Sequence, residues 1–174
     1  GVEIIEGGAF GNCQNLNGSL SLPSTLKKIT GVNTFLYDKF VCELKLPDGL
    51  EEIGEQCFLD CPGFYGELKL PSHLKKLGKG AFKGCKNLTG NLEIPQTLTA
   101  IPAGAFNGCW FGGNLQLHDG ISAIGDNAFA NCGGTALPII SYTLPREPKN
   151  SKSASKLCNN PASLGVIVLA CLES

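Results

Sequence analysis

Apolar and polar residues alternate in short segments that recur along the chain, as in "GNLEIPQTLTAIPAGAFNGC" at residues 90–109. Each segment opens with two apolar residues that flank one polar residue, and a proline follows in four of five repeats. The pairs are Leu20/Leu22, Leu44/Leu46, Leu68/Leu70, Leu92/Ile94 and Leu115/Leu117. Since side chains on a strand point to alternate faces, each pair predicts a short strand with one buried face, which the proline ends.

A phenylalanine and, three residues later, a cysteine close each segment. The phenylalanines recur every 23 to 25 residues, at Phe10, Phe35, Phe58, Phe82, Phe106 and Phe129. The cysteines are Cys13, Cys61, Cys85, Cys109 and Cys132. These segments are too short for a stable helix, so we expect one helical or 3₁₀ turn in each. Repeats this small bury their apolar faces only by stacking on neighbours, so the pattern predicts a β-rich solenoid.

The recurring pattern LxLPxxLxxIgxxAFxxC resembles the BspA-like, or Treponema-type, leucine-rich repeat. The residues that carry it are Leu46, Pro47, Leu50, Ile53, Gly54, Phe58 and Cys61, then Leu70, Pro71, Leu74, Leu77, Gly78, Ala81, Phe82 and Cys85. The resemblance implies an α/β leucine-rich-repeat fold, a right-handed superhelix with one strand of each repeat on its concave side. It also implies a secreted or cell-surface protein of host-associated bacteria or some protists, linked to adhesion.

The length of 174 residues predicts a single domain. About six regular repeats cover residues 2–145, and residues 146–174 are predicted to be a degenerate terminal repeat in which Ser155 replaces the phenylalanine. Gly1 starts inside a repeat, directly before "VEIIEGGAF". We therefore expect a leader and earlier residues to precede it in the natural protein.

The repeat pattern is irregular in two places. In the second repeat Asp38 stands where cysteine belongs, so we expect it to turn outward or cap a short turn, while Phe40 helps to fill the space. After Cys132 two registers are open: Ile140 continues the strand position, or "YTLP" does so after an insertion. We prefer the second, because it places Pro145 thirteen residues before Cys158, close to the usual fourteen.

Charge and cysteine content limit the classes of partner and of structure that we expect for the chain. The formal net charge is −1 without clustered Lys or Arg, which argues against a nucleic-acid partner. No stretch reaches the ~18 apolar residues of a membrane span, so we expect no membrane insertion. Five of the nine cysteines share one repeat position, which predicts a column of buried free thiols rather than a disulfide framework. A contact between Cys42 and Cys57 stays open.

Residues with catalytic potential do not form a recognisable site. His73 and His118 each lie in the turn after a strand, where we expect them to face solvent. A triad of Ser122, His118 and Asp119 can be drawn, but no nucleophile elbow accompanies it. The cysteines lack zinc spacing, and no glycine-rich phosphate loop is present. We therefore predict a protein that is not an enzyme and needs no metal or cofactor.

The outward residues of the predicted strands form a polar strip on the presumed concave side. Its candidate ligand-binding residues are Glu43, Lys45, Glu67, Lys69, Asn91, Glu93, Asn114 and Gln116. We expect the glutamates to form charge pairs across repeats rather than a general acid/base pair. Trp110 follows Cys109 and should be partly exposed, which makes it a candidate aromatic contact together with Tyr65.

Because extended solenoid faces are binding surfaces, we predict a non-enzymatic recognition module, secreted or on the cell surface. Its partner is expected to be an extracellular protein or glycan, bound in adhesion or host interaction, and a monomer is favoured over an oligomer. The alternative is a structural spacer that presents other domains of a longer polypeptide. A binding module should lose affinity when the strip is altered, whereas a spacer should be indifferent.

Overall fold

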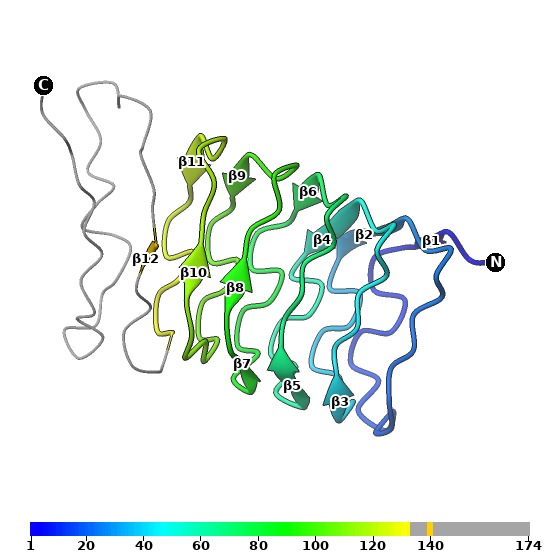
Figure 1. Ribbon diagram of the computed structural model, residues 1–174. Helices are drawn as coiled ribbons and strands as arrows, with labels where there is room; N and C mark the ends of the chain where they lie inside the picture. Colours follow the sequence, from blue (N-terminus) through cyan, green and yellow to red (C-terminus); the bar gives the residue numbers. More distant parts are fainter. Residues whose placement is uncertain (133–138, 141–174) are drawn as a thin grey trace, which may run out of the picture.

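The chain forms a solenoid of stacked repeats, each of which we call a rung and name by its phenylalanine. The computed structural model describes residues 1–132 and the backbone of residues 139–140. The strands are β1 (Ile4–Ile5), β2 (Lys28–Val32), β3 (Cys42–Glu43), β4 (Glu52–Glu55), β5 (Phe64–Glu67), β6 (Lys76–Leu77), β7 (Leu88–Thr89), β8 (Leu92–Glu93), β9 (Ala100–Ile101), β10 (Leu115–Gln116), β11 (Ala123–Ile124) and β12 (Ile139–Ile140). Paired strands are parallel, and successive rungs lie side by side along one axis (Figure 1).

Short sheets run along the solenoid with the strand orders β1-β2-β4-β6, β9-β11, β3-β5-β7 and β8-β10-β12. The strands predicted at the alternating pairs are confirmed at Leu92 in β8 and Leu115 in β10. The prediction is wrong at the other three pairs: β3 and β5 end one residue before Leu44 and Leu68, and Leu20 lies in no strand. The longest strand, β2, contains the buried Ile29, and β4 contains the buried Ile53, although neither lies at a predicted strand position. The sequence analysis treated these isoleucines only as apolar positions, because the alternation around each is too short to predict a strand.

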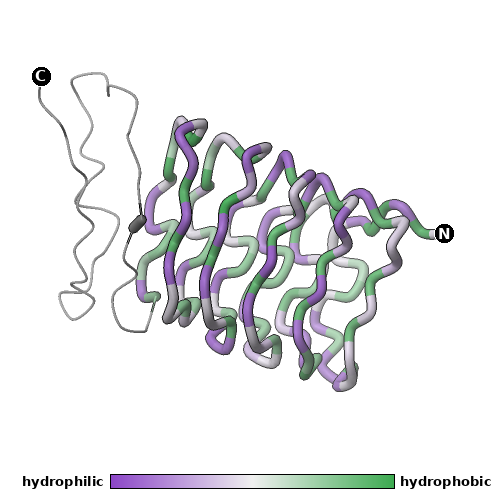
Figure 2. The backbone as a smooth tube through the Cα atoms, viewed as in Figure 1, coloured by the Kyte–Doolittle hydropathy of each residue, from purple (hydrophilic) through white to green (hydrophobic). Residues whose placement is uncertain are grey.

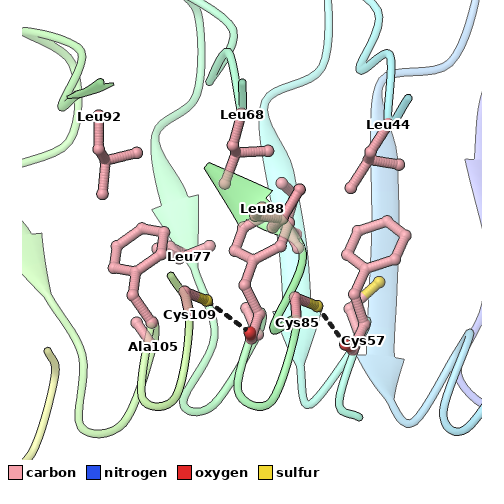
Figure 3. Packing of buried hydrophobic residues seen from close by; sticks show 14 of the residues in the cluster. Leu44, Cys57, Leu68, Leu77, Cys85, Leu88, Leu92, Ala105 and Cys109 are labelled. Carbon is pink, nitrogen blue, oxygen red and sulfur yellow. Dashed lines mark hydrogen bonds between the residues drawn. The ribbon is translucent and has the colours of Figure 1, made fainter. Parts of the chain in front are cut away.

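Six phenylalanine rings form a continuous stack through the core. Neighbouring rings are within 11° of parallel, with centroids 5.1 Å apart between Phe10 and Phe35 and 5.7 Å apart between Phe82 and Phe106. Rows of leucines and cysteines flank the rings on opposite sides, as the row Leu44, Leu68 and Leu92 shows (Figure 3). Stacking neighbours therefore bury the face that a single rung cannot bury alone, as the repeat pattern predicts.

The expected helical or 3₁₀ turns are wrong, since the structure shows no helix in residues 1–132. Each phenylalanine turn contains two residues with positive φ, four positions apart, such as Gly80 (60°) and Gly84 (78°). Right-handed helices need negative φ, so these residues interrupt any helical hydrogen bonding. Their N–H groups instead donate to the next rung, from Gly80 to the Ala103 carbonyl at 3.0 Å and from Gly84 to the Asn107 carbonyl at 2.8 Å.

The column of free thiols is confirmed as buried at Cys61, Cys85 and Cys109, while Cys13 and Cys132 at its ends are half-buried. The three buried thiols each donate to a carbonyl of a preceding rung. Cys85 Sγ donates to the Phe58 carbonyl and Cys109 Sγ to the Phe82 carbonyl, both at 3.1 Å (Figure 3). Burial raises the pKa of Cys61 to about 12, so its thiol keeps the proton that it donates. All cysteines of the described residues are free, so the open Cys42–Cys57 contact is not a disulfide.

Asp38 does not turn outward, because its side chain is only 1% exposed. It does cap a turn: its Oδ1 accepts the Cys13 N–H at 3.1 Å, while its Oδ2 has no hydrogen-bond partner. Burial raises the pKa of the Asp38 carboxyl, and the Cys13 hydrogen bond opposes this in part. Phe40 fills the adjacent space as expected, packing edge-on against Phe35 at 6.4 Å.

After Cys132 the next strand position belongs to β12 rather than to "YTLP". Ile139 pairs with Leu115 and Ile140 with Gln116, so the segment containing Ile140 follows β10 directly. The preferred register was therefore wrong, because the direct continuation needs no insertion. The predicted terminal repeat at residues 146–174 lies outside the described residues.

We predict that Phe82→Ala lowers the free energy of unfolding by about 3–5 kcal/mol, as for other buried aromatic truncations. Phe82 is fully buried and stacks between Phe58 and Phe106, at 5.3 and 5.7 Å. Lys69→Ala, an 85%-exposed control, should change it by no more than about 0.5 kcal/mol. Urea denaturation measures both, and equal losses would contradict the stacked core.

Asp38→Asn should become more stable relative to the natural protein as the pH rises. Because burial raises the pKa of Asp38 in the folded state, its protonated form stabilises the fold fully below the unfolded pKa, near 3.8. This stabilisation is lost as the pH rises through the folded pKa. Urea denaturation at about pH 3 and about pH 7 measures the difference. Asp48→Asn, at an exposed carboxylate, controls for the removal of one charge. A difference independent of pH would show that burial does not raise the pKa of Asp38.

Candidate binding surface

The polar strip of eight predicted residues occupies the outward positions of four successive rungs. Glu43 ends β3, Glu67 ends β5, Glu93 ends β8 and Gln116 ends β10. Seven of the eight residues are exposed, and Asn114 is half-buried, while Leu44, Leu68, Leu92 and Leu115 point into the core between them. Hydrophilic and hydrophobic colours accordingly alternate along each rung in Figure 2.

Two adjoining surface hollows join most of the strip into one groove. The hollow nearer the N-terminus has a volume of about 530 Å³ and includes Glu43, Lys45 and Asp48 in its lining. The next one, of about 570 Å³, includes Asn91, Glu93 and Gln116. Both are lined by Glu67 and Lys69, so the hollows adjoin at this rung, and we call the two together the groove. Of the predicted strip, only Asn114 lines neither hollow, although its N–H donates to Asn91 Oδ1 at 2.8 Å.

The charges on the strip pair within rungs rather than between them, which corrects the expected cross-rung charge pairs. Lys45 Nζ lies 3.7 Å from Glu43 Oε2, and Lys69 Nζ lies 4.0 Å from Glu67 Oε2. The interaction of Glu67 with the next rung is a hydrogen bond from Asn91 Nδ2, at 3.4 Å. Both lysine side chains are more than 80% exposed, so these loose pairs leave the ammonium groups accessible to a ligand.

Charge pairs between rungs occur on a different surface, beside β4 and β6. Lys75 Nζ lies 3.0 Å from Glu51 Oε2, and Lys76 Nζ lies 2.6 Å from Glu52 Oε1. The hydrogen bond from Lys75 holds the pKa of Glu51 below its usual value. These pairs join neighbouring rungs at 3.0 Å or less, whereas the pairs of the groove lie within one rung at 3.7 and 4.0 Å.

Tyr65 lies beside the strip, a position that the repeat spacing did not indicate. In the ladder between β3 and β5, Glu43 is paired with Tyr65 and not with Glu67, the residue one sequence repeat later. Gly66, with φ of 83°, follows Tyr65 and contributes to the irregular path that carries Glu67 onward. Tyr65 is 48% exposed, so its ring flanks Glu43 on the outward face.

Trp110 is 57% exposed, as predicted, and the adjacent Phe111 is buried against Phe106. Trp110 does not line either hollow of the groove. Tyr65 does not line either hollow, but its pairing with Glu43 places it next to the strip.

The two histidines differ in their exposure to solvent. His73 is exposed as expected, but His118 is buried, which corrects the expectation of a solvent-facing residue. His118 Nε2 lies 3.2 Å from the Leu98 carbonyl, and its Nδ1 accepts the Gly120 N–H at 3.1 Å. Because both ring nitrogens have partners, the imidazole can be buried in the position that proline occupies in other rungs.

The triad that could be drawn from the sequence is not assembled. The ring nitrogens of His118 contact backbone groups, and Ser122 Oγ donates to the Thr99 carbonyl at 3.0 Å. Within residues 1–132 no three His, Cys, Asp or Glu side chains are grouped so that they could hold a metal ion. The same part of the chain has no helix of the length and apolarity that a membrane span requires.

The stacked parallel rungs, with apolar residues inside and a polar strip outside, define a leucine-rich-repeat solenoid. The chain belongs to the family described as "BspA type Leucine rich repeat region (6 copies)", whose model matches residues 1–65 and 30–146.

Two solved bacterial structures are similar to the chain. A leucine-rich repeat protein from Bacteroides ovatus shares 27% identity, with a TM-score of 0.65 over 78% of this chain and 34% of that protein. The chain thus spans about a third of the Bacteroides protein. The Treponema pallidum leucine-rich repeat protein shares 20% identity and supports the fold alone, with a TM-score of 0.55 over 75% and 70% of the two chains. No protein with a curated description matches the chain.

Proposed function

We propose that the chain is a non-enzymatic recognition module that binds an extracellular protein or glycan through the groove. The observation that carries the proposal is the adjacency of the two hollows, which together are lined by seven of the eight strip residues. Repeat proteins of this architecture use such extended surfaces for binding. The module acts as a monomer, because the groove is complete within one chain.

The same proposal places the module outside the cell, in adhesion or host interaction. Membership of the BspA type family supports a secreted or cell-surface location. The second candidate function is a structural spacer within a longer surface protein. It is favoured by the Bacteroides relative, of which this chain matches only about a third.

A Lys45→Glu/Lys69→Glu variant separates the two functions. The purified chain is screened by surface plasmon resonance against immobilised matrix proteins and host and microbial glycans. A ligand of the groove should bind the variant at least about tenfold more weakly, because two donors are lost and two repulsive charges are gained. Lys83→Glu/Lys86→Glu, with the same charge change at exposed positions that line neither hollow, is the matched control.

Binding that falls only in the groove variant supports recognition through the strip. Equal binding by both variants and the natural chain contradicts a role for the groove. A complete lack of ligands across the panel contradicts the recognition proposal and favours the spacer.

A further inference from the structure

We propose that the groove binds a neutral, hydroxyl-rich linear glycan that lies across the rungs, along the solenoid axis. This inference rests on the proposed function and names the ligand class for the same site.

The groove offers donors and acceptors in close alternation, which suits hydroxyl groups. Glu43 and Lys45 place a carboxylate 3.7 Å from an ammonium, and Glu67 and Lys69 repeat this arrangement at 4.0 Å. Further along, Asn91 and Gln116 present amides that both donate and accept. A sugar hydroxyl also donates and accepts, so neighbouring hydroxyls of one ring can satisfy both members of such a pair.

The charge of the groove disfavours an anionic glycan. Its lining contains two lysines, Lys45 and Lys69, against four carboxylates. The carboxylates are Glu43, Asp48, Glu67 and Glu93. Sulfate or carboxylate groups on a ligand would meet this excess of negative charge, whereas a neutral chain would not.

The spacing of the rungs favours a glycan over a peptide along the axis. Neighbouring parallel strands lie about 4.8 Å apart, whereas an extended peptide repeats about every 6.7 Å, or two residues. A peptide would therefore lose register with the rungs, while each unit of an extended 1,4-linked glycan advances by nearly one rung. Strand addition inside the groove is blocked too, because β5 already pairs with β3 and β7, and β10 with β8 and β12.

The groove also lacks the residues that dominate protein interfaces. Binding energy at such interfaces is concentrated in Trp, Tyr and Arg, while Lys, Glu and Asp are depleted. Residues 1–132 contain no arginine, and the exposed Trp110 lies outside the groove. The aromatic ring beside the strip is Tyr65, next to Glu43, where it can pack on the apolar face of a sugar ring.

The test is isothermal titration calorimetry with neutral oligosaccharides of two to six units. Four series cover different stereochemistry: β-1,4-glucan, β-1,4-linked N-acetylglucosamine, β-1,4-mannan and α-1,4-glucan. In at least one series, affinity should rise with each added unit up to about four, the number of strip rungs that line the groove, and then level off. A heparin hexasaccharide should bind more weakly than the neutral hexamer.

Two variants test the position of the glycan, because Asn91 lines the groove and Tyr65 lies at its edge, next to Glu43. Asn91→Ala and Tyr65→Ala should each weaken the best oligosaccharide by about 3- to 10-fold. Trp110→Ala, which removes an aromatic ring that is 57% exposed and lines neither hollow, should leave the affinity unchanged. Circular dichroism confirms that each variant remains folded.

Failure of all four series to bind overturns the inference, as does binding that depends on Trp110 and not on Asn91. If a matrix protein binds and the Lys45→Glu/Lys69→Glu variant weakens it while no oligosaccharide binds, the glycan inference falls and the proposed recognition function stands. If no ligand of either class binds, both fall.

Discussion

The stack of phenylalanine rings, together with the backbone hydrogen bonds beside it, is the constraint on which the other features of the solenoid depend. Phe58 N–H donates to the Ala81 carbonyl and Phe82 N–H to the Ala105 carbonyl, both at 2.8 Å, so each ring is fixed relative to the next rung. A single rung has neither a second ring to stack on nor acceptors for these groups. Stability is consequently a property of neighbouring rungs and not of the individual repeat.

This constraint also creates the binding surface. Once the rings and leucines are fixed in columns, the residues between the leucines must point outward at the spacing of the rungs. The position of the groove is therefore set by the core, although Asn91 also accepts the Asn114 N–H of the next rung. Loose pairs such as Lys45–Glu43 belong to this outward surface, because they contribute little to folding and remain accessible.

The phenylalanine, leucine and cysteine columns could be predicted because they follow from local spacing that repeats along the chain. The turn conformation was missed, although Gly or Asn occupies many of the positive-φ positions, as at Gly80, Gly84, Asn127 and Asn131. That recurrence four residues apart is the signal that could have identified it.

The remaining differences depend on contacts between rungs, which spacing alone does not reveal. His118 is buried because the Leu98 carbonyl and the Gly120 N–H satisfy its ring. Tyr65 reaches the strip because the register between β3 and β5 differs from the sequence repeat. Seven of the eight predicted strip residues are nevertheless exposed, since alternation along the chain places them on the surface, and their role in binding stays a prediction.

Native-state hydrogen exchange measured by NMR tests the dependence of each rung on its neighbours most directly. The amides of Phe58, Phe82 and Phe106 should be among the slowest to exchange, and Phe82→Ala should reduce protection in both neighbouring rungs together. If Phe82→Ala accelerated exchange only within its own rung, the rungs would be independent units, and the account of a core shared between them would be contradicted.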